Sequence, residues 1–366
     1  MSATAVEAAT GGRRGRPDFH ALPVAGVDAL TDDAVAVTFD VPDDLAEVFA
    51  FAAGQSLTVR RVVDGEEHRR SYSICAAEGE PPRIAVREIP GGLFSRWLTR
   101  ELRVGEVVEV QPPSGGFRAP VGAGERHLCI AAGSGITPML SVAATALRDP
   151  ASSVTLLYGN RTTSSVMFAE ELADLKDRHP ARFDLVHVLS REPREVELFS
   201  GRLDVGRLRD LLTRLVPLAD VDHVWLCGPH ALTSGAQEVL TALGVPPERV
   251  HVELFYVDEA PPELRRADRA APVGETSEVE VVLDGRRTTD PLPRDRTLLD
   301  AAQRVRSDLP FACKGGVCGT CRARVVEGEV EMVRNYALEP VEVEQGFVLT
   351  CQSFPVSDRV VVDYDA

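Results

Sequence analysis

The sequence predicts a multidomain chain: an antiparallel β-barrel, an α/β domain with a parallel sheet, and an α+β domain of the β-grasp type. Residues 18–121 contain short alternating apolar runs separated by Gly and Pro, which is typical of an antiparallel barrel. Residues 122–256 contain apolar strands alternating with helical segments, which indicates a parallel sheet covered on both faces. Residues 277–366 return to alternation around a cysteine-rich loop. We expect a disordered tail at 1–17 and a charged, proline-bearing linker at 257–276.

Composition and charge narrow the class of protein. The chain has 366 residues, a net charge of −16 and 44% hydrophobic residues, which suits two or three globular domains. The negative charge disfavours non-specific nucleic-acid binding and can steer docking to a basic protein partner. No apolar run approaches the roughly 18–20 residues that span a bilayer. Residues 1–17 lack the apolar segment of a signal peptide, so we expect a cytoplasmic protein without membrane contact.

Candidate cofactor-binding residues in the barrel lie on one predicted strand. Arg70 and Tyr72 share one face of a regular strand, and Ser71 and Ser73 share the other. Arg70 could hold a phosphate, Tyr72 could stack on a flat ring and Ser73 could bond to a ring nitrogen. About 20 residues further on, a predicted helix begins after a Gly-Gly pair, and its first N–H groups can face an anion. Together these features favour a phosphate-bearing flavin over an ordinary surface strand.

A glycine turn marks a candidate nucleotide site in the second domain. A continuous apolar strand at 128–132 ends in Gly133-Ser134-Gly135, and Pro138 suits the first turn of the helix that follows. The turn is not a complete GxGxxG fingerprint, but its N–H groups point outward. Ligands of parallel sheets bind at the carboxyl ends of the strands, where this turn lies. The sequence therefore predicts a nucleotide at this edge.

Two arginines favour NADPH as that nucleotide. NAD-binding sheets often place an acidic residue after the second strand, where this chain has Arg161 instead. The third strand ends in Ser190-Arg191. Both arginines suit a 2′-phosphate through charge-assisted contacts, although two merely solvated arginines would give the same pattern. We therefore expect NADPH, with NADH as the alternative.

Cys227 is the cysteine of the second domain that we associate with chemistry. It begins a Cys-Gly-Pro turn at the end of the fourth predicted strand. A buried cysteine usually serves packing, but the carboxyl edge of the sheet suits contact with a nicotinamide. Cys75 and Cys129 lie within predicted strands and are interpreted as core residues. The eight histidines form no recognisable ligand cluster in the sequence, and we interpret those in strands as structural.

Four cysteines of the third domain match the plant-type spacing of a [2Fe–2S] cluster. Four residues separate Cys313 from Cys318, two separate Cys318 from Cys321, and Cys351 follows 30 positions later. The glycines of this loop can accept positive φ and bring backbone N–H groups close to the sulfurs. Disulfides are disfavoured because no secretory segment is visible. A zinc site stays open as an alternative, although such sites usually pair two short CxxC-like knuckles.

The chain resembles the ferredoxin–NADP reductase family with a C-terminal plant-type ferredoxin domain. That resemblance implies FAD bound by Arg70, Ser71, Tyr72, Ser73, Gly91, Gly92, Leu93, Phe94 and Ser95. It implies a nicotinamide nucleotide bound by Gly133, Gly135, Thr137, Arg161, Ser190, Arg191, Gly228 and Pro229. It implies a reaction centre formed by Ser73, Cys227 and Glu253. Glu197 and Phe199 lie where the family usually has a lysine and a tyrosine at the 2′-phosphate, which counts against NADPH.

A closer similarity is to reductase subunits of the phenylacetyl-CoA epoxidases (ring 1,2-epoxidases). It extends from about residue 18 to the end and includes Tyr158-Gly159-Asn160-Arg161-Thr162, His251-Val252-Glu253-Leu254-Phe255, Arg334-Asn335-Tyr336-Ala337-Leu338-Glu339 and Leu349-Thr350-Cys351-Gln352-Ser353. The resemblance implies electron flow from NADPH through FAD and the [2Fe–2S] cluster to the oxygenase subunits of a multicomponent di-iron enzyme that epoxidises phenylacetyl-CoA. A di-iron site needs two Glu-x-x-His pairs, and Glu248 to His251 has no second copy here.

Two alternatives remain open on the sequence. A reductase that serves a Rieske-type oxygenase with NADH, as in steroid 9α-hydroxylase systems, shares the same architecture. A redox-sensing or zinc-binding interaction protein belongs to a different class. Six glutamates and one arginine, Arg334, lie between 327 and 344 beside the cysteine loop. Such a run is usually just solvated, but beside a redox module it suits docking to a partner.

Overall fold

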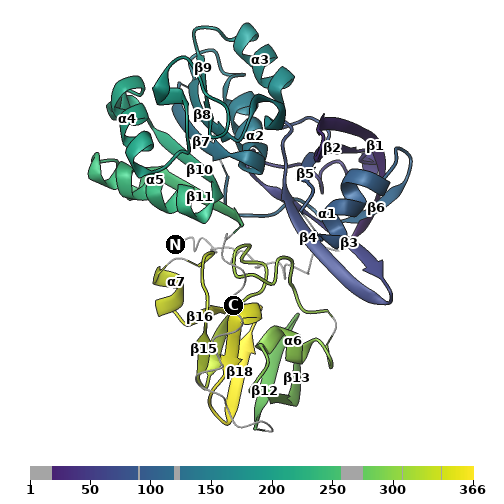
Figure 1. Cartoon of the computed structure of the whole chain (residues 1–366). Coiled ribbons are helices and arrows are strands. Elements are labelled where there is room, and N and C mark those ends of the chain that lie inside the picture. Colours follow the sequence, from purple (N-terminus) through teal and green to yellow (C-terminus); the bar gives the residue numbers. More distant parts are fainter. Residues whose placement is uncertain (1–18, 90, 119–123, 257–274, 307, 339) are drawn as a thin grey trace, which may run out of the picture.

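The computed structural model describes residues 19–89, 91–118, 124–256, 275–306, 308–338 and 340–366. It contains one large sheet in each of three domains, so the predicted fold class is confirmed (Figure 1). The predicted tail and most of the predicted linker lie outside the described residues, and the domain boundaries stay predictions. None of the helices in the described ranges is long and apolar enough to cross a membrane.

The N-terminal domain is an antiparallel barrel with the strand order β4-β3-β6-β1-β2-β5. Its strands are β1 (His20–Thr31), β2 (Ala34–Phe39), β3 (Ser56–Val63), β4 (Glu66–Ser73), β5 (Arg83–Arg87) and β6 (Val107–Val110). A bridge between Ile74 and Ile84 joins the chain just after β4 to β5 and closes the barrel. Alternate residues such as Val37, Leu57 and Val110 point inward and are fully buried, as the period of two predicts. The predicted helix forms as α1 (Leu93–Arg96) and a following π-helical turn (Trp97–Glu101).

The second domain is a five-stranded parallel sheet with the order β11-β10-β7-β8-β9. Its strands are β7 (Arg126–Ala132), β8 (Ser153–Asn160), β9 (Phe183–Leu189), β10 (His223–Pro229) and β11 (Val250–Tyr256). Its helices are α2 (Ile136–Ala146), α3 (Ala169–Arg178), α4 (Val205–Leu215) and α5 (His230–Ala242). Apolar side chains of α2 and α3 pack in one core cluster, and those of α4 and α5 pack in another. Helices therefore cover both faces of the sheet.

The C-terminal domain is a mixed five-stranded sheet with the order β13-β12-β18-β14-β16. Its elements are β12 (Thr276–Leu283), β13 (Arg286–Pro293), α6 (Leu298–Ala302), β14 (Arg322–Glu327), β15 (Val330–Met332), α7 (Pro340–Glu344), β16 (Phe347–Leu349), β17 (Ser353–Pro355) and β18 (Arg359–Asp363). The predicted hairpin turn at Asp284-Gly285 is confirmed, since both residues have positive φ (54° and 68°). The core of this domain is a cluster of its own that includes Cys321 and Cys351.

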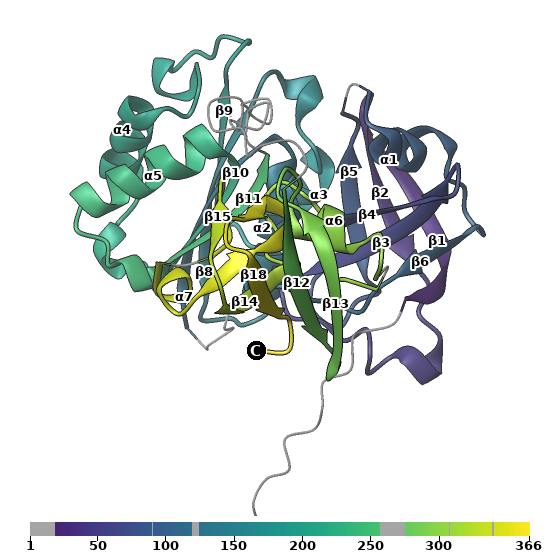
Figure 2. The ribbon, with the colours of Figure 1, turned by 90° about the horizontal axis from the view of Figure 1, so that it is seen from below.

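One hydrophobic cluster extends across the interface between the first two domains, in addition to the core inside the barrel. Phe117 of the barrel domain packs edge-on against Trp225 of the parallel sheet, with ring centroids 5.1 Å apart. Ser141 Oγ of α2 donates a hydrogen bond to the Ala76 carbonyl over 2.6 Å, also across the interface. These contacts fix the two domains against each other. The C-terminal domain lies across their junction (Figure 2).

Candidate redox site

A cavity of about 2620 Å³ lies where the three domains meet. It is larger than the 300–1,000 Å³ of an ordinary ligand pocket, so it has room for more than one ligand. The predicted residues that line it are Arg70, Ser71, Tyr72, Ser73, Gly92, Leu93, Phe94, Ser95, Gly133, Thr137, Arg161, Ser190, Gly228, Pro229, Glu253, Cys313, Cys318 and Cys351. The predicted residues outside its lining are Gly91, Gly135, Arg191, Cys227 and Cys321. The structure thus brings the three predicted sites to one place.

The predicted flavin strand is regular, and its side chains alternate as expected. β4 pairs with β3 without a bulge, so Tyr72 lies opposite Leu57 and Ser71 lies opposite Thr58. The Ser71 and Thr58 hydroxyls are 3.0 Å apart and hydrogen-bonded. The Tyr72 ring is tilted against the ring of Phe94, with centroids 6.4 Å apart. This strand and the start of α1 therefore form one continuous wall of the cavity.

The glycine turn at the end of β7 is packed tightly against β10. A Cβ placed on Gly135 would lie 2.2 Å from the carbonyl oxygen of Cys227, so only glycine fits this position. The Tyr158 hydroxyl donates to the Gly133 carbonyl over 2.9 Å and the Thr137 hydroxyl donates to the Ser134 carbonyl over 2.8 Å. Gly135 thus serves packing between turn and strand, while Gly133 lines the cavity.

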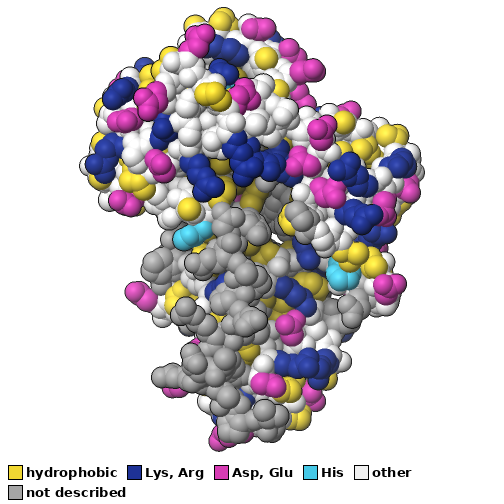
Figure 3. Space-filling view, in the orientation of Figure 1, with side chains coloured by type: hydrophobic (Ala, Val, Ile, Leu, Met, Phe, Trp, Pro, Cys, Tyr) yellow, Lys and Arg dark blue, Asp and Glu magenta, His cyan; other side chains and the backbone are white. Residues whose placement is uncertain are grey.

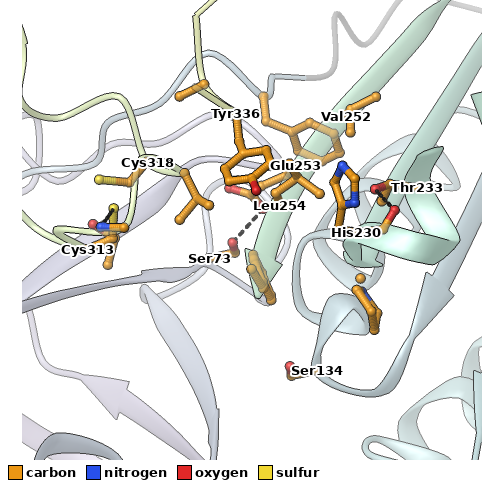
Figure 4. A pocket seen from close by; sticks show the side chains of 18 of the residues that line it. Ser73, Ser134, His230, Thr233, Val252, Glu253, Leu254, Cys313, Cys318 and Tyr336 are labelled. Carbon is orange, nitrogen blue, oxygen red and sulfur yellow. Dashed lines mark hydrogen bonds between the residues drawn. The ribbon is translucent and has the colours of Figure 1, made fainter. Parts of the chain in front are cut away.

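A hydrogen bond between Ser73 and Glu253 connects the barrel to the parallel sheet. Ser73 Oγ donates to Glu253 Oε2 over 2.8 Å (Figure 4). Burial raises the pKa of the Glu253 carboxyl from 4.5 to about 7, and the bond from Ser73 opposes this shift. Near neutral pH this carboxyl can therefore hold or release a proton.

Cys227 lies beside Glu253 but does not reach the cavity. The two residues are register partners on β10 and β11. The Cys227 side chain is fully buried, and burial together with the Glu253 carboxylate raises its thiol pKa. Its thiol is therefore neutral, and its role in the reaction stays a prediction.

The two predicted 2′-phosphate arginines differ in their positions. The Arg161 side chain is half exposed, lines the cavity and lies 3.5 Å from Asp33 Oδ2. Arg191 is exposed but lies outside the lining, although its neighbour Ser190 belongs to it. Arg202, which sequence reasoning missed, lines the cavity from the loop before α4. Figure 3 shows Lys and Arg side chains gathered along this part of the surface, where the upper two domains meet.

The four predicted cluster cysteines interact as two pairs, Cys313 with Cys318 and Cys321 with Cys351. The neighbouring Cys318 thiol lowers the pKa of Cys313, and the neighbouring Cys351 thiol lowers the pKa of Cys321. Within the described ranges no three His, Cys, Asp or Glu side chains could hold one metal ion together. Two thiol pairs fit a cluster with two irons better than a single zinc ion.

Backbone groups of the cysteine loop face the sulfurs, as predicted. The Gly315 N–H donates to Cys313 Sγ over 3.3 Å. Gly316 and Gly319 have positive φ values of 80° and 66°. The third positive φ of the loop belongs to Lys314 at 52° rather than to Gly315. The Lys314 ammonium bonds to Asp300 and Gln303 of α6 and its turn, which supports this loop.

Comparison with known proteins agrees with this geometry. Family models described as oxidoreductase FAD-binding domain, oxidoreductase NAD-binding domain and 2Fe-2S iron-sulfur cluster binding domain match residues 21–119, 129–238 and 281–356. The chain is 44% identical over 95% of its length to a subunit of 1,2-phenylacetyl-CoA epoxidase from Escherichia coli (strain K12), covering 98% of that protein. The chain belongs to the ferredoxin–NADP reductase family with a C-terminal ferredoxin domain.

Other members of this reductase family match over almost the whole chain. The ferredoxin reductase component of 3-ketosteroid-9-alpha-monooxygenase from Rhodococcus rhodochrous is 34% identical over 94% of this chain and 96% of its own. A solved structure of phthalate dioxygenase reductase has a TM-score of 0.62 at 23% identity, over 94% of this chain and 98% of its own, which shows a shared fold. The protein is thus an oxidoreductase that uses FAD, a nicotinamide nucleotide and a [2Fe–2S] cluster for electron transfer.

Three histidines of the reductase lie together, which the sequence could not show. His127, His223 and His251 occupy the starts of β7, β10 and β11 around Trp225. Burial lowers the pKa values of His127 and His251 to about 4, so both are neutral at pH 7. His251 stacks on the Trp225 ring with centroids 4.0 Å apart. This arrangement supports the interpretation of the strand histidines as structural residues.

Proposed function

We propose that the protein is the NADPH-dependent reductase component that supplies electrons to a di-iron oxygenase that epoxidises phenylacetyl-CoA. The observation that supports the electron path is the single cavity lined by the flavin strand, the nucleotide turn and the cysteine loop. The similarity to the Escherichia coli epoxidase component supports the partner and its substrate. A cytoplasmic location is part of the same proposal.

Different residues of the cavity would bind the flavin, hold the cluster and exchange a proton. A bound flavin accepts two electrons as a hydride and releases them singly, as a [2Fe–2S] cluster requires. Arg70 and Tyr72 would bind this flavin, and the Cys313–Cys318 and Cys321–Cys351 pairs would hold the cluster. Ser73 and Glu253 would orient the reacting ring and exchange its proton, since the carboxyl titrates near pH 7.

The choice of NADPH rests on two cationic side chains. Arg161 and Arg202 line the cavity at the carboxyl edge of the parallel sheet. Either guanidinium can contact a 2′-phosphate with two hydrogen bonds. Replacing Arg161 and Arg202 by alanine should raise KM for NADPH by at least tenfold and leave KM for NADH nearly unchanged. Equal effects on both nucleotides would favour NADH as the physiological donor.

A second candidate is a reductase of a Rieske-type oxygenase. It is favoured by the 3-ketosteroid-9-alpha-monooxygenase reductase component, which matches over nearly the same length. The two candidates are separated by recovering the tagged protein from its own cells grown on phenylacetate and identifying the proteins that bind it. Di-iron oxygenase subunits, followed by NADPH-dependent loss of phenylacetyl-CoA in the reconstituted mixture, would support the epoxidase. Recovery of a Rieske oxygenase among the bound proteins would reject phenylacetyl-CoA as the substrate. The proposed electron path through flavin and cluster would remain.

A further inference from the structure

Two contacts attach the ferredoxin domain to the walls of the cavity. The Tyr336 ring meets the His230 ring edge to face, with centroids 5.4 Å apart and an angle of 62° between the planes. The Arg69 guanidinium lies over the Phe311 ring, 4.8 Å from its centroid. The first contact reaches the nucleotide domain and the second reaches the barrel. None of the four residues in these two contacts has been given a role in cofactor binding or catalysis above.

On the reductase side, each contact residue is next to a cofactor-binding segment. His230 is the first residue of α5 and follows Gly228-Pro229 directly. Arg69 precedes Arg70 on the flavin strand and is buried, with an ion pair to Glu67. These two contacts therefore set the position of the ferredoxin domain relative to the flavin and nucleotide sites.

On the ferredoxin side, Tyr336 is braced against the cysteine loop. Its backbone N–H donates to the Gly316 carbonyl over 3.1 Å. The Asn335 side chain accepts hydrogen bonds from the backbone N–H groups of Ala337 and Leu338 and fixes the turn around Tyr336. Leu338 anchors the same segment in the ferredoxin core. The backbone of Tyr336 thus has a fixed position relative to the loop that carries Cys313 and Cys318.

Figure 4 shows Tyr336 and His230 beside Glu253 and Leu254, with Cys313 and Cys318 further along the same cavity. We propose that Tyr336 and His230 are positioning residues that hold the cysteine loop against the flavin site, so that electrons pass rapidly from flavin to cluster. Each of the two contacts involves one aromatic ring of the ferredoxin domain, and both are weak enough to open when this domain meets its oxygenase. This inference rests on the proposed electron path from flavin to cluster.

The test compares holo-protein variants by stopped-flow reduction with NADPH, observing flavin and cluster separately. Tyr336→Ala and His230→Ala should each slow cluster reduction about two- to tenfold while flavin reduction keeps its rate, which is the change expected for one aromatic pair. The double variant should be no slower than either single variant, since both remove the same contact. Tyr336→Phe keeps the ring and should retain the wild-type rate. Val326→Ala, at an exposed site of the same domain, is the control.

A readout other than turnover is the magnetic coupling between half-reduced flavin and reduced cluster in EPR spectra. The coupling should weaken in Tyr336→Ala and remain in Tyr336→Phe, because it depends on distance. Cluster reduction at the wild-type rate in both alanine variants would refute the positioning role. Tighter NADPH binding in Tyr336→Ala with an unchanged rate of cluster reduction would also refute the positioning role. It would indicate that the Tyr336 ring hinders binding of the nucleotide. Failure of the wild-type cluster to be reduced would instead refute the proposed electron path.

Discussion

At the scale of single residues, burial sets the protonation of the Ser73–Glu253 pair. The folded protein keeps a proton on Glu253 between about pH 4.5 and 7, and the unfolded chain releases it in that window. The unfolded state therefore binds fewer protons, and the free energy of unfolding falls as pH rises through the window. As pH rises past 7 the half-buried carboxyl ionises in the folded protein as well, and the free energy of unfolding stops falling.

Glu253→Gln is expected to remove this pH dependence, because glutamine stays neutral and can still accept the bond from Ser73. The free energy of unfolding of the variant minus that of the wild type should therefore increase from pH 5 to pH 8, by on the order of 3 kcal/mol at most. Urea unfolding of the holo-protein measures this through the fluorescence of Trp97 and Trp225, which report on the first two domains. The same difference between variant and wild type at both pH values would contradict the prediction.

Gly135→Ala tests the tight packing of the nucleotide turn. The added methyl would meet the Cys227 carbonyl, and the strain should cost about 1–3 kcal/mol of folding free energy. Gly206→Ala in α4 is the matched control, since its Cβ would lie 3.6 Å from Asp204 Oδ1, an ordinary contact. The control should be neutral or stabilising by up to about 1 kcal/mol. Both effects are measured by the urea unfolding described above, and equal stability of the two variants would exclude the clash.

At the scale of elements, the sequence predicted those features that depend only on residues close together in the chain. The alternation on β4 and the spacing of the four cysteines depend on nearby residues, and both agree with the structure. The sequence could not place Arg202 in the cavity, because that position depends on how the loop before α4 folds back over the sheet. It also could not predict the Tyr336–His230 contact, because that depends on how two domains pack.

The short helix α6 depends on its cap. Thr297 Oγ1 accepts a hydrogen bond from the Asp300 N–H over 3.2 Å, and Asp300 also binds Lys314 of the cysteine loop. Thr297→Ala should cost about 1 kcal/mol, and Thr297→Ser should cost much less. The measurement is the temperature at which visible cluster absorption is lost, which should fall by a few degrees in the alanine variant only. Equal losses in both variants would point to the missing methyl group rather than to the cap.

At the scale of the whole molecule, the order of the electron path is open to a direct test. Cys313→Ser removes one thiolate of the Cys313–Cys318 pair, so electron delivery to an oxygenase should be abolished. Flavin reduction by NADPH should keep its wild-type rate, because the cysteine lies in another domain. The two rates are measured by flavin bleaching and by reduction of the partner. Normal delivery by this variant would mean that electrons leave directly from the flavin.

The ferredoxin domain has a hydrophobic core that no other domain enters, whereas one core cluster spans the barrel and the nucleotide domain and couples the separate core of the barrel to the parallel sheet. Unfolding is cooperative within a core, so calorimetry of the holo-protein should resolve two heat-absorption peaks rather than three. One peak should coincide with loss of the iron–sulfur absorption and the other with release of FAD. A cell that is short of iron can then accumulate flavin-loaded protein, and the ferredoxin domain can mature later without disturbing the rest.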